Sequence, residues 1–245
     1  MVLNWLPFYW RGFQQTTFYT YRLNNLQDLD RVFAGCNRNI KRNIKKAETQ
    51  LTVLEDLDPA TFYALNQKSF DRQQIAMPYS LAQFLKHDAA LAAHQARKIW
   101  YAVDEAQQIH AVAYLIWDKQ SSYYHLSGDD TELRSSGAGI LLIWKAIQYT
   151  ANQLQLHTFD FEGSMIPAIE KIRLQFGAIQ VPYFFIWKYY TTRYQWLDAI
   201  KKWRIKGTKV SLPTPPHTSA HATTPNYPLQ TIRCFEGASP YPYPH

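Results

Sequence analysis

Between residues 50 and 190, strand-like and helix-like segments follow one another in an order that few architectures accommodate. Runs of β-branched and aromatic residues predict strands, and apolar residues three or four positions apart predict helices. The predicted order is strand, two helices, three strands, helix, strand, helix and strand, at 50–55, 58–73, 81–94, 98–105, 109–119, 121–128, 140–154, 157–163, 166–176 and 181–190. The second and third of the consecutive strands meet at Lys119 and Gln120, a connection short enough for a hairpin. The sequence therefore predicts an α/β fold with a mixed sheet whose middle strands are antiparallel.

The segment before residue 50 predicts a strand at 16–23 and a helix at about 26–48. Four basic residues of this helix fall at the helical spacing i, i+3, i+4 and i+7 and form a stripe, namely Arg38, Lys41, Arg42 and Lys45. Apolar residues lie on another face. The stripe is either a solvated helix face or a ledge for the phosphates of a nucleotide, an RNA or a lipid head group.

Composition limits the class of protein. The chain has 245 residues, of which 47% are hydrophobic and 18% charged, enough for one ordinary domain with appendages or for two small ones. A net charge of +7 favours anionic partners. Two cysteines exclude a disulfide framework or a cysteine-based metal site, and we expect no metal.

The N-terminus lacks the pattern of a signal peptide, and no apolar stretch is long enough to span a membrane, so we expect a cytoplasmic protein.

The last part of the chain differs in composition. Residues 195–206 predict a basic helix with two tryptophans, which either packs on the domain or lies on an anionic surface. Eight of the 13 prolines follow Gly207, mixed with Ser, Thr and His. Such a composition cannot bury enough apolar surface to become ordered, so we expect residues 207–245 to be disordered.

A loop of small residues directly precedes the aliphatic helix. It consists of Arg134, Ser135, Ser136, Gly137, Ala138 and Gly139. Glycine allows backbone amides to approach a ligand, and the following helix presents unpaired N–H groups and the positive end of its dipole. Arg134 adds a charge-assisted hydrogen bond. The loop is thus either an anion-binding loop or a plain strand-to-helix turn.

Two strands carry candidate proton acceptors. Strand alternation places Thr158, Asp160 and Glu162 on one face. One carboxylate either lies exposed at the strand end or accepts hydrogen bonds from the next helix. Alternatively, Asp160 or Glu162 takes a proton from an attacking amine, directly or through water. In the preceding strand the same alternation places His125 on a face with Ser127, where it is a second proton acceptor or a structural histidine.

A strand, the pattern R-x-x-G-x-G leading a helix, and a strand that diverges from the first together resemble the GNAT-type N-acyltransferase superfamily. The segments "HLSGDDTELRSSGAGILLIWKAI", "FDFEGSMIPAIEKIRLQFGA" and "NRNIKRNIKKAE" are similar to its FemAB-like branch. The resemblance runs from about Leu6 to Lys188. This branch includes the peptidoglycan aminoacyl transferases related to methicillin-resistance factors.

The resemblance implies a GNAT-like fold and a phosphate loop for the donor. Arg134, Gly137 and Gly139 match the pyrophosphate loop of the superfamily, with the amides of Ser135, Ser136 and Ala138 completing it. Members of the branch usually carry two domains in tandem. We therefore interpret residues 1–48 as the remnant of a first domain and 49–190 as a complete one, followed by the helix at 191–206 and the tail. Many members use a tyrosine early in the last helix as an acid, which this chain lacks.

The implied activity is transfer of an acyl or aminoacyl group to an amine, with acyl-CoA or aminoacyl-tRNA as co-substrate and no tightly bound cofactor. The acceptor would lie between the strands that end at Gly128 and Gly163, and Asp160, Glu162 or His125 would act as base. A role in bacterial cell-envelope biosynthesis would place the protein in the cytoplasm, including at the inner face of the membrane. The alternative is a catalytically silent module that binds RNA or an anionic membrane surface through Arg38, Lys41, Arg42 and Lys45.

Overall fold

The computed structural model describes residues 4–163, 166–191, 196 and 232–233. Contacts divide the chain into two compact units. The larger unit contains residues 19–181, and the smaller unit contains the described residues on either side of that range.

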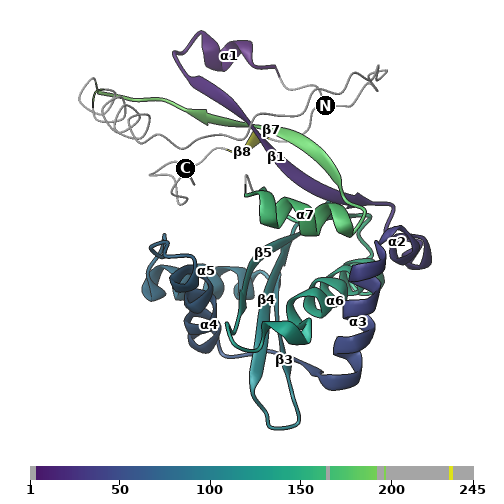
Figure 1. The fold of residues 1–245 in the computed structure, drawn as a ribbon. Helices are drawn as coiled ribbons and strands as arrows, with labels where there is room; N and C mark the ends of the chain where they lie inside the picture. The colour runs from purple at the N-terminus through teal and green to yellow at the C-terminus, as the bar shows by residue number, and fades with distance from the viewer. Residues whose placement is uncertain (1–3, 164–165, 192–195, 197–231, 234–245) are drawn as a thin grey trace, which may run out of the picture. The chain divides into compact units, whose positions relative to one another are not determined.

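The larger unit is built on a mixed sheet (Figure 1). Its strands run in the order β2-β3-β4-β5-β6-β1. They are β1 (Gln14–Asn24, of which the C-terminal part belongs here), β2 (Thr52–Glu55), β3 (Arg97–Val103), β4 (Ile109–Trp117), β5 (Ser121–Asp129) and β6 (Thr158–Asp160). All neighbours are antiparallel except β5 and β6, which are parallel. The helical crossover between β5 and β6 permits this parallel pair. The expected mixed sheet with antiparallel middle strands is confirmed.

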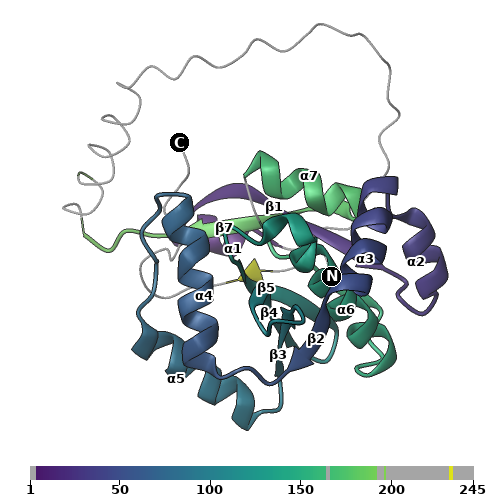
Figure 2. The ribbon, with the colours of Figure 1, turned by 60° about the horizontal axis from the view of Figure 1, so that its bottom comes forward.

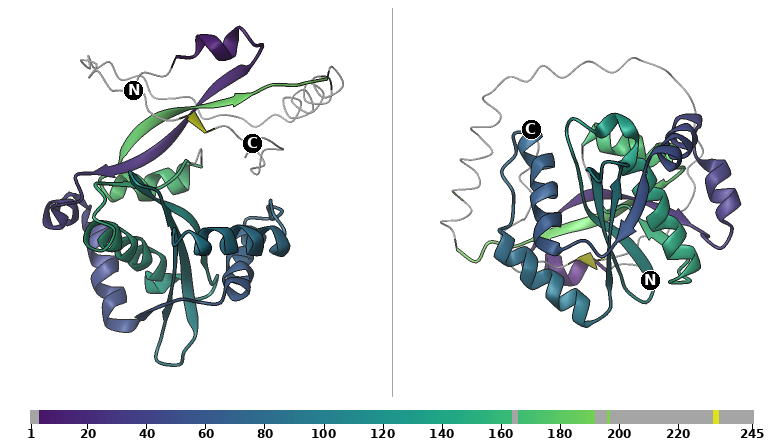
Figure 3. Two further views of the ribbon diagram at one scale, coloured as in Figure 1. Left: turned by 180° about the vertical axis from the view of Figure 1, so that it is seen from behind. Right: turned by 90° about the horizontal axis from the view of Figure 1, so that it is seen from below.

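Helices cover both faces of this sheet. They are α2 (Leu29–Gly35), α3 (Arg38–Gln50), α4 (Pro59–Arg72), α5 (Leu81–Ala93), α6 (Ala138–Asn152) and α7 (Pro167–Gln175), with a 3₁₀ turn η1 (Arg134–Ser136) before α6. In Figures 2 and 3, α4 and α5 lie on one face of β3, β4 and β5, and α3 and α6 lie on the other. Among the described residues, no helix is both long enough and apolar enough to cross a bilayer.

Two apolar clusters follow from this arrangement. Phe62 and Phe84 pack on Tyr114 on the α4–α5 face. Ile44 of α3 and Phe159 of β6 belong to the larger cluster on the α3–α6 face. Full burial of such a side chain contributes about 1.5–3 kcal/mol, so both clusters stabilise the packing of the helices on the sheet.

The single helix predicted over 26–48 is wrong in the structure, which has α2 and α3 instead. The chain leaves the helix at Cys36 and Asn37, both of which have extended backbone angles. Asn37 then caps α3, because its side chain accepts a hydrogen bond from the backbone N–H of Ile40 at 2.9 Å. A cap residue in mid-pattern therefore outweighs the helical spacing around it.

The boundary expected at residue 48 does not separate the compact units. Tyr21 of β1 and Ile40 of α3 are buried in the same cluster as Leu141 of α6, so this N-terminal part completes the core of the larger unit. Most of the helix expected at 195–206 and of the tail expected at 207–245 lies outside the described residues. Of the tail, the structure describes β8 (Ile232–Arg233), a two-residue strand.

The smaller unit joins both ends of the described chain. It contains α1 (Leu6–Tyr9), the N-terminal part of β1 and most of β7 (Ile179–Trp187). Strand β7 is the neighbour of β1 and pairs in parallel with β8. Aromatic rings hold this unit together: Phe18 stacks on Phe185 with 5.1 Å between ring centroids, and Trp5 contacts Phe184 at 6.4 Å.

Candidate functional site

The parallel strands β5 and β6 pair only over their first residues. The ladder runs from Ser121 opposite Thr158 to Tyr123 opposite Asp160, where β6 ends while β5 continues to Asp129. On its other edge, β5 pairs with β4 through a bulge. Opposite two consecutive β4 residues lie Tyr124 and Leu126, so His125 is an extra residue in β5. Because bulges bend a strand and increase its twist, the bulge explains why β5 departs from β6 at this point.

The bulge also changes which side chains share a face. His125 contacts the Tyr114 ring at 6.2 Å, and Leu126 packs in the same cluster, so both lie on the α4–α5 face. Tyr124 packs on the opposite face, and its hydroxyl is hydrogen-bonded by Ser127. The prediction that His125 and Ser127 share a face is therefore wrong, because the extra residue shifts the alternation by one position.

His125 and Glu162 meet where the two strands part. Each lies two residues beyond the last β5–β6 pair. The Nδ1 atom of His125 is 3.2 Å from Oε1 and 3.3 Å from Oε2 of Glu162. Glu162 has a φ of +58°, so strand alternation no longer applies to it, and its backbone turns the carboxylate toward β5. The side chains are 23% and 11% exposed, so the pair is mostly buried but reachable by a small molecule. A carboxylate in this position orients the imidazole and stabilises it when it takes up a proton.

Asp160 is buried and fully engaged in hydrogen bonds. Its carboxylate accepts from Nε of Arg22 at 2.8 Å, from the hydroxyl of Thr20, and from the backbone N–H of Glu162 at 2.8 Å. These contacts tie β6 to β1 and hold Glu162 in its left-handed conformation.

A second imidazole lies beside the pair. The ring of His87 on α5 is 5.3 Å from that of His125. Partial burial lowers the pKa of His87, and the neighbouring His125 lowers it further, so His87 stays neutral at pH 7. In the described part of the chain, no three His, Cys, Asp or Glu side chains come together as the ligands of a metal ion would.

The two glycines of the small-residue loop have different structural causes. Gly137 has a φ of +83°, ends η1 and precedes α6. A Cβ there would lie 3.2 Å from the carbonyl oxygen of Asn43 on α3. Gly137 is therefore required by the turn itself. Gly139 lies in the first turn of α6, and a Cβ there would meet no atom within 4 Å. Open space next to Gly139 fits a loop that receives a ligand.

The backbone N–H groups of this loop also differ. Those of Ser136 and Gly137 bond carbonyl groups within the turn, at 3.2 and 3.3 Å. That of Ala138 bonds the hydroxyl of Ser136 at 3.3 Å. Within the described residues, the N–H groups of Gly139 and Ile140 have no partner, as is usual in a first helical turn. Two backbone donors at the positive end of the α6 dipole thus have no protein partner among the described residues.

Charged side chains fix the ends of the loop. Arg134 and Arg72 both donate to the carboxylate of Asp129 at the end of β5. Burial alone would raise the pKa of Asp129, but the two guanidinium groups outweigh it and hold the pKa below its usual value. The ammonium of Lys46 on α3 donates to the carbonyl of Ser135 at 2.9 Å. Arg134 remains half exposed, so its other N–H groups can reach an anion beside the loop.

Sequence reasoning missed Tyr124, the first residue of β5 after the last β5–β6 pair. Its ring contacts Phe159 at 6.2 Å. Burial raises the pKa of its hydroxyl well above the usual value despite the hydrogen bond from Ser127, so the group stays protonated. Only its place beside the predicted diverging strand could have pointed to it. His87 and Lys46 gave no signal, because tertiary packing brings them to the site.

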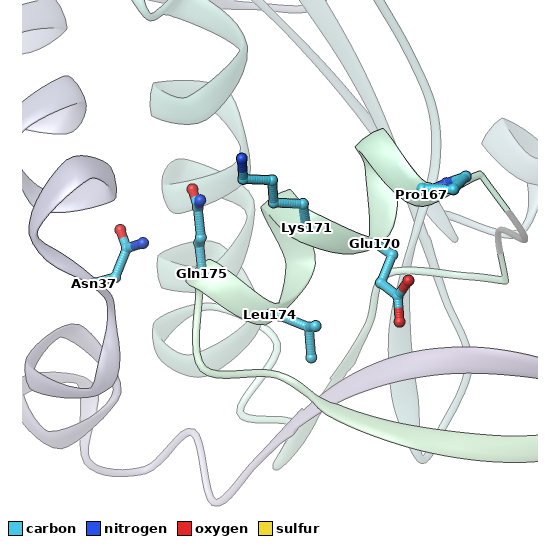
Figure 4. A pocket seen from close by; sticks show the side chains of 6 residues that line it. All are labelled: Asn37, Pro167, Glu170, Lys171, Leu174 and Gln175. Carbon is cyan, nitrogen blue, oxygen red and sulfur yellow. The ribbon is translucent and has the colours of Figure 1, made fainter. Parts of the chain in front are cut away.

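The pocket in Figure 4 is lined by none of the site residues described above. It has a volume of about 360 Å³ and is lined by Asn37, Pro167, Glu170, Lys171, Leu174 and Gln175. Lys171 and Gln175 extend from one side of α7, and Glu170 and Leu174 extend from another (Figure 4). A second pocket of about 310 Å³ includes Trp100 and Lys145. Neither pocket contains a residue predicted for catalysis or donor binding.

Comparisons with known proteins agree with this geometry. The structure is similar to that of FemX, with a TM-score of 0.65 and 12% identity over 79% of this chain and 70% of FemX. It is also similar to L-PGS from Bacillus licheniformis, with a TM-score of 0.54 and 10% identity over 85% of this chain and 72% of that one. A third structure, the C-terminal domain of a putative lysylphosphatidylglycerol synthetase from Agrobacterium fabrum, has a TM-score of 0.53 and 10% identity, covering 78% and 66%. At such low sequence identity, the structural similarity shows a shared fold and nothing more.

No curated protein has significant sequence similarity to the chain. The family model of the acetyltransferase (GNAT) domain matches residues 34–165, more than half of the sequence. This range contains the parting strands, the loop before α6 and the His125–Glu162 pair. The expected GNAT-like fold is thereby confirmed, and the chain belongs to the acetyltransferase (GNAT) domain family.

Proposed function

We propose that the protein is an N-acyltransferase of the FemAB-like branch that transfers an acyl or aminoacyl group to an amine. The observation that carries this proposal is the hydrogen-bonded His125–Glu162 pair at the point where β5 and β6 part. The donor is an acyl-CoA or an aminoacyl-tRNA. Fold similarity to FemX and to a putative lysylphosphatidylglycerol synthetase supports the aminoacyl donor and a role in the cell envelope.

The donor's phosphates would lie at the start of α6. The N–H groups of Gly139 and Ile140 have no protein partner among the described residues, and Arg134 stands beside them half exposed. An anion there gains hydrogen bonds and the favourable end of the helix dipole. Helix α6 starts at the carboxyl end of β5, and β6 runs parallel to β5, so this anion site and Glu162 belong to the same edge of the sheet. A donor bound by its phosphates can thus extend its acyl group toward the parting strands.

The chemistry needs a neutral amine and a route for its proton. The amine nitrogen attacks the donor's carbonyl carbon, the new C–N bond forms, and the bond from carbon to the leaving sulfur or oxygen breaks. His125, oriented by Glu162, takes the proton from the nitrogen. The protonated His125 then gives this proton to the leaving sulfur or oxygen, which returns the imidazole to its neutral form. Asp160, already engaged by three donors, positions Glu162 in this scheme.

Replacing Glu162 with glutamine tests this assignment. The amide keeps the shape but cannot stabilise a protonated imidazole, so we expect kcat to fall roughly 10²–10⁴-fold with little change in donor affinity. Glu105→Gln, a change at an exposed turn residue, is the matched control and should keep full activity. Transfer is followed by release of free thiol from acetyl-CoA with a series of amines, and of aminoacyl ester from charged tRNA. A parent protein that binds neither donor contradicts the proposal.

The basic stripe supports a polyanionic donor or partner. Arg38, Arg42 and Lys45 are exposed on α3, and none of them forms an ion pair within the described residues. Lys41 differs, because it is partly buried, donates to the carbonyl of Ala34 at 2.7 Å and lies over a phenylalanine ring. Helix α3 also contacts the loop before α6 through Lys46. We therefore propose that the stripe, without Lys41, binds the phosphates of tRNA.

This second assignment has its own test, which also addresses the alternative of a catalytically silent module. The double variant Arg42→Glu with Lys45→Glu should weaken tRNA binding. The slope of log affinity against log salt concentration should also become shallower, because about two fewer counterions are released on binding. Lys41→Glu should lower stability more than affinity, because it breaks contacts within α2 and α3. The silent-module alternative predicts tRNA or anionic-vesicle binding of the same salt dependence with no transfer from any donor. Salt-independent binding would mean that the stripe is only a solvated helix face.

A further inference from the structure

The most exposed aromatic side chains all belong to the smaller unit. Among the described residues, Tyr9 is 62% exposed, Trp10 71%, Tyr190 83% and Trp196 70%. The large exposed side chains of the larger unit are aliphatic and none exceeds 50%. Exposed aromatic groups gathered in one part of a molecule mark an interaction surface.

The composition around these residues is equally one-sided. Six of the fifteen residues from 4 to 18 are aromatic, and six of the ten from 182 to 191. Neither range contains an aspartate or a glutamate, whereas both contain a basic residue, Arg11 and Lys188. The partner of this surface is therefore anionic and receives aromatic side chains.

The large exposed apolar residues of α1 and its C-cap lie on one side. Leu6, Tyr9 and Trp10 are separated by three and four positions, which places them on a single helix face. Leu6 is 50% exposed beside the two rings. Other rings of the unit are used internally, such as Trp5, which contacts Phe8 and Phe184. The face of Leu6, Tyr9 and Trp10 is thus not needed for the packing of the unit.

Lys188 places a cation beside this face. Its ammonium lies 5.5 Å from the ring centroid of Phe13 and 5.6 Å from that of Tyr190, and it donates to the carbonyl of Arg11. The long aliphatic stem with a charge among aromatic rings is the arrangement of residues at a bilayer interface. It also fixes the exposed ring of Tyr190 relative to the end of α1.

We propose that the smaller unit binds the surface of a membrane that contains anionic lipids, through Leu6, Tyr9 and Trp10. Trp and Tyr are the side chains that favour the boundary between headgroups and acyl chains. Arg11 and Lys188 attract the negative surface. An RNA partner would also accept aromatic stacking, but the exposed Leu6 has no ring to stack on a base, whereas a bilayer accepts an aliphatic side chain. This inference uses none of the residues assigned to transfer.

The test is flotation of the full chain with vesicles of phosphatidylcholine alone and with phosphatidylglycerol added. We expect binding to the mixed vesicles only, and weaker binding as salt rises. Trp10→Ser and Leu6→Ser should each reduce the affinity, by roughly tenfold for the tryptophan. Leu174→Ser is the matched control, because Leu174 of α7 is also 50% exposed but lies in the larger unit. It should bind as the parent does.

Circular dichroism and melting curves identify any variant that fails to fold, and Leu6→Ser and Trp10→Ser serve as independent probes of the same face. Equal binding by the parent and both variants overturns the proposal, as does failure of the parent to bind mixed vesicles. Binding of single-stranded RNA that Trp10→Ser abolishes, without vesicle binding, would assign the surface to nucleic acid instead. Acetyl transfer to a soluble amine does not require this surface. A failure of the proposed transfer activity can therefore be distinguished from a failure of vesicle binding.

Discussion

Replacing Gly139 with alanine should have opposite effects on stability and on donor binding. Gly139 has helical geometry in the first turn of α6, and the added Cβ would meet no atom within 4 Å. Alanine in a helix is more stable than glycine by about 0.5–1 kcal/mol. For a unit of this size, that corresponds to a rise in Tm of roughly 1–4 °C. Yet the same Cβ occupies the space that we assign to the donor's phosphates.

Gly137→Ala provides the contrast. Its φ of +83° costs an L-residue about 1–2 kcal/mol, and the new Cβ would lie 3.2 Å from the carbonyl oxygen of Asn43. We expect Tm to fall by roughly 2–8 °C. Only the substitution at 139 separates donor binding from folding, because the substitution at 137 disturbs the turn itself.

Calorimetric titration with coenzyme A, paired with melting curves on the same samples, measures both quantities. Loss of one hydrogen bond to a charged phosphate costs about 1.5–3 kcal/mol, so Gly139→Ala should weaken binding by roughly ten- to a hundred-fold. Gly139→Val should weaken it further at near-parent stability. If Gly139→Ala binds coenzyme A as tightly as the parent, the donor's phosphates do not reach α6. If Gly137→Ala is as stable as the parent, the argument from backbone strain is wrong.

Three further outcomes follow from packing and charge. Gly128→Ala should lower the free energy of unfolding in urea by about 1–3 kcal/mol, because its Cβ would lie 2.6 Å from the backbone oxygen of Leu65. Gly35→Ala, with open space at the Cβ, is its control and should not destabilise the protein. The pKa of Asp129 is lowered in the folded state, so its stabilisation is complete above the unfolded value of about 4 and is lost as pH falls through the folded value. Asp129→Asn should therefore lower Tm at neutral pH but progressively less below pH 4, and a constant difference would contradict this. Burial raises the pKa of Cys36 to about 11, so iodoacetamide should label it only in unfolded protein, as peptide mass spectrometry would show.

The parts of the fold that depend on local chemistry could be predicted from the sequence. Asp58 and Ser80 accept backbone hydrogen bonds at the starts of α4 and α5, and Gly177 follows α7 in a left-handed conformation, as is usual for these residue types at helix ends. The parting of β5 and β6 was expected from the resemblance. The helix ends rest on residues adjacent in the chain, which is why a local pattern can reveal them, whereas the parting of the two strands came from the resemblance alone.

The remaining features depend on tertiary contacts. Strand alternation was extended to Glu162 and Ser127, but β6 ends at Asp160 and a bulge interrupts β5 at His125. A bulge leaves little trace in a hydrophobic pattern, because it inserts one residue of any type. The pairing of His125 with Glu162 follows from the bulge and from a left-handed φ at the carboxylate. Neither could be derived from periodicity.

Strand β1 is translated first but completes the sheet late. It lies between β6 and β7, and its Arg22 pairs with Asp160, 138 positions further along the chain. At ribosomal rates of about 5–20 residues per second, β1 waits roughly 7–30 s before its partner emerges. During that time the nascent chain carries an unpaired strand rich in Thr, Tyr and Phe, the type of segment that associates with other strands. We therefore expect synthesis of this protein to depend on holdase chaperones that cover β1 until β6 has left the ribosome.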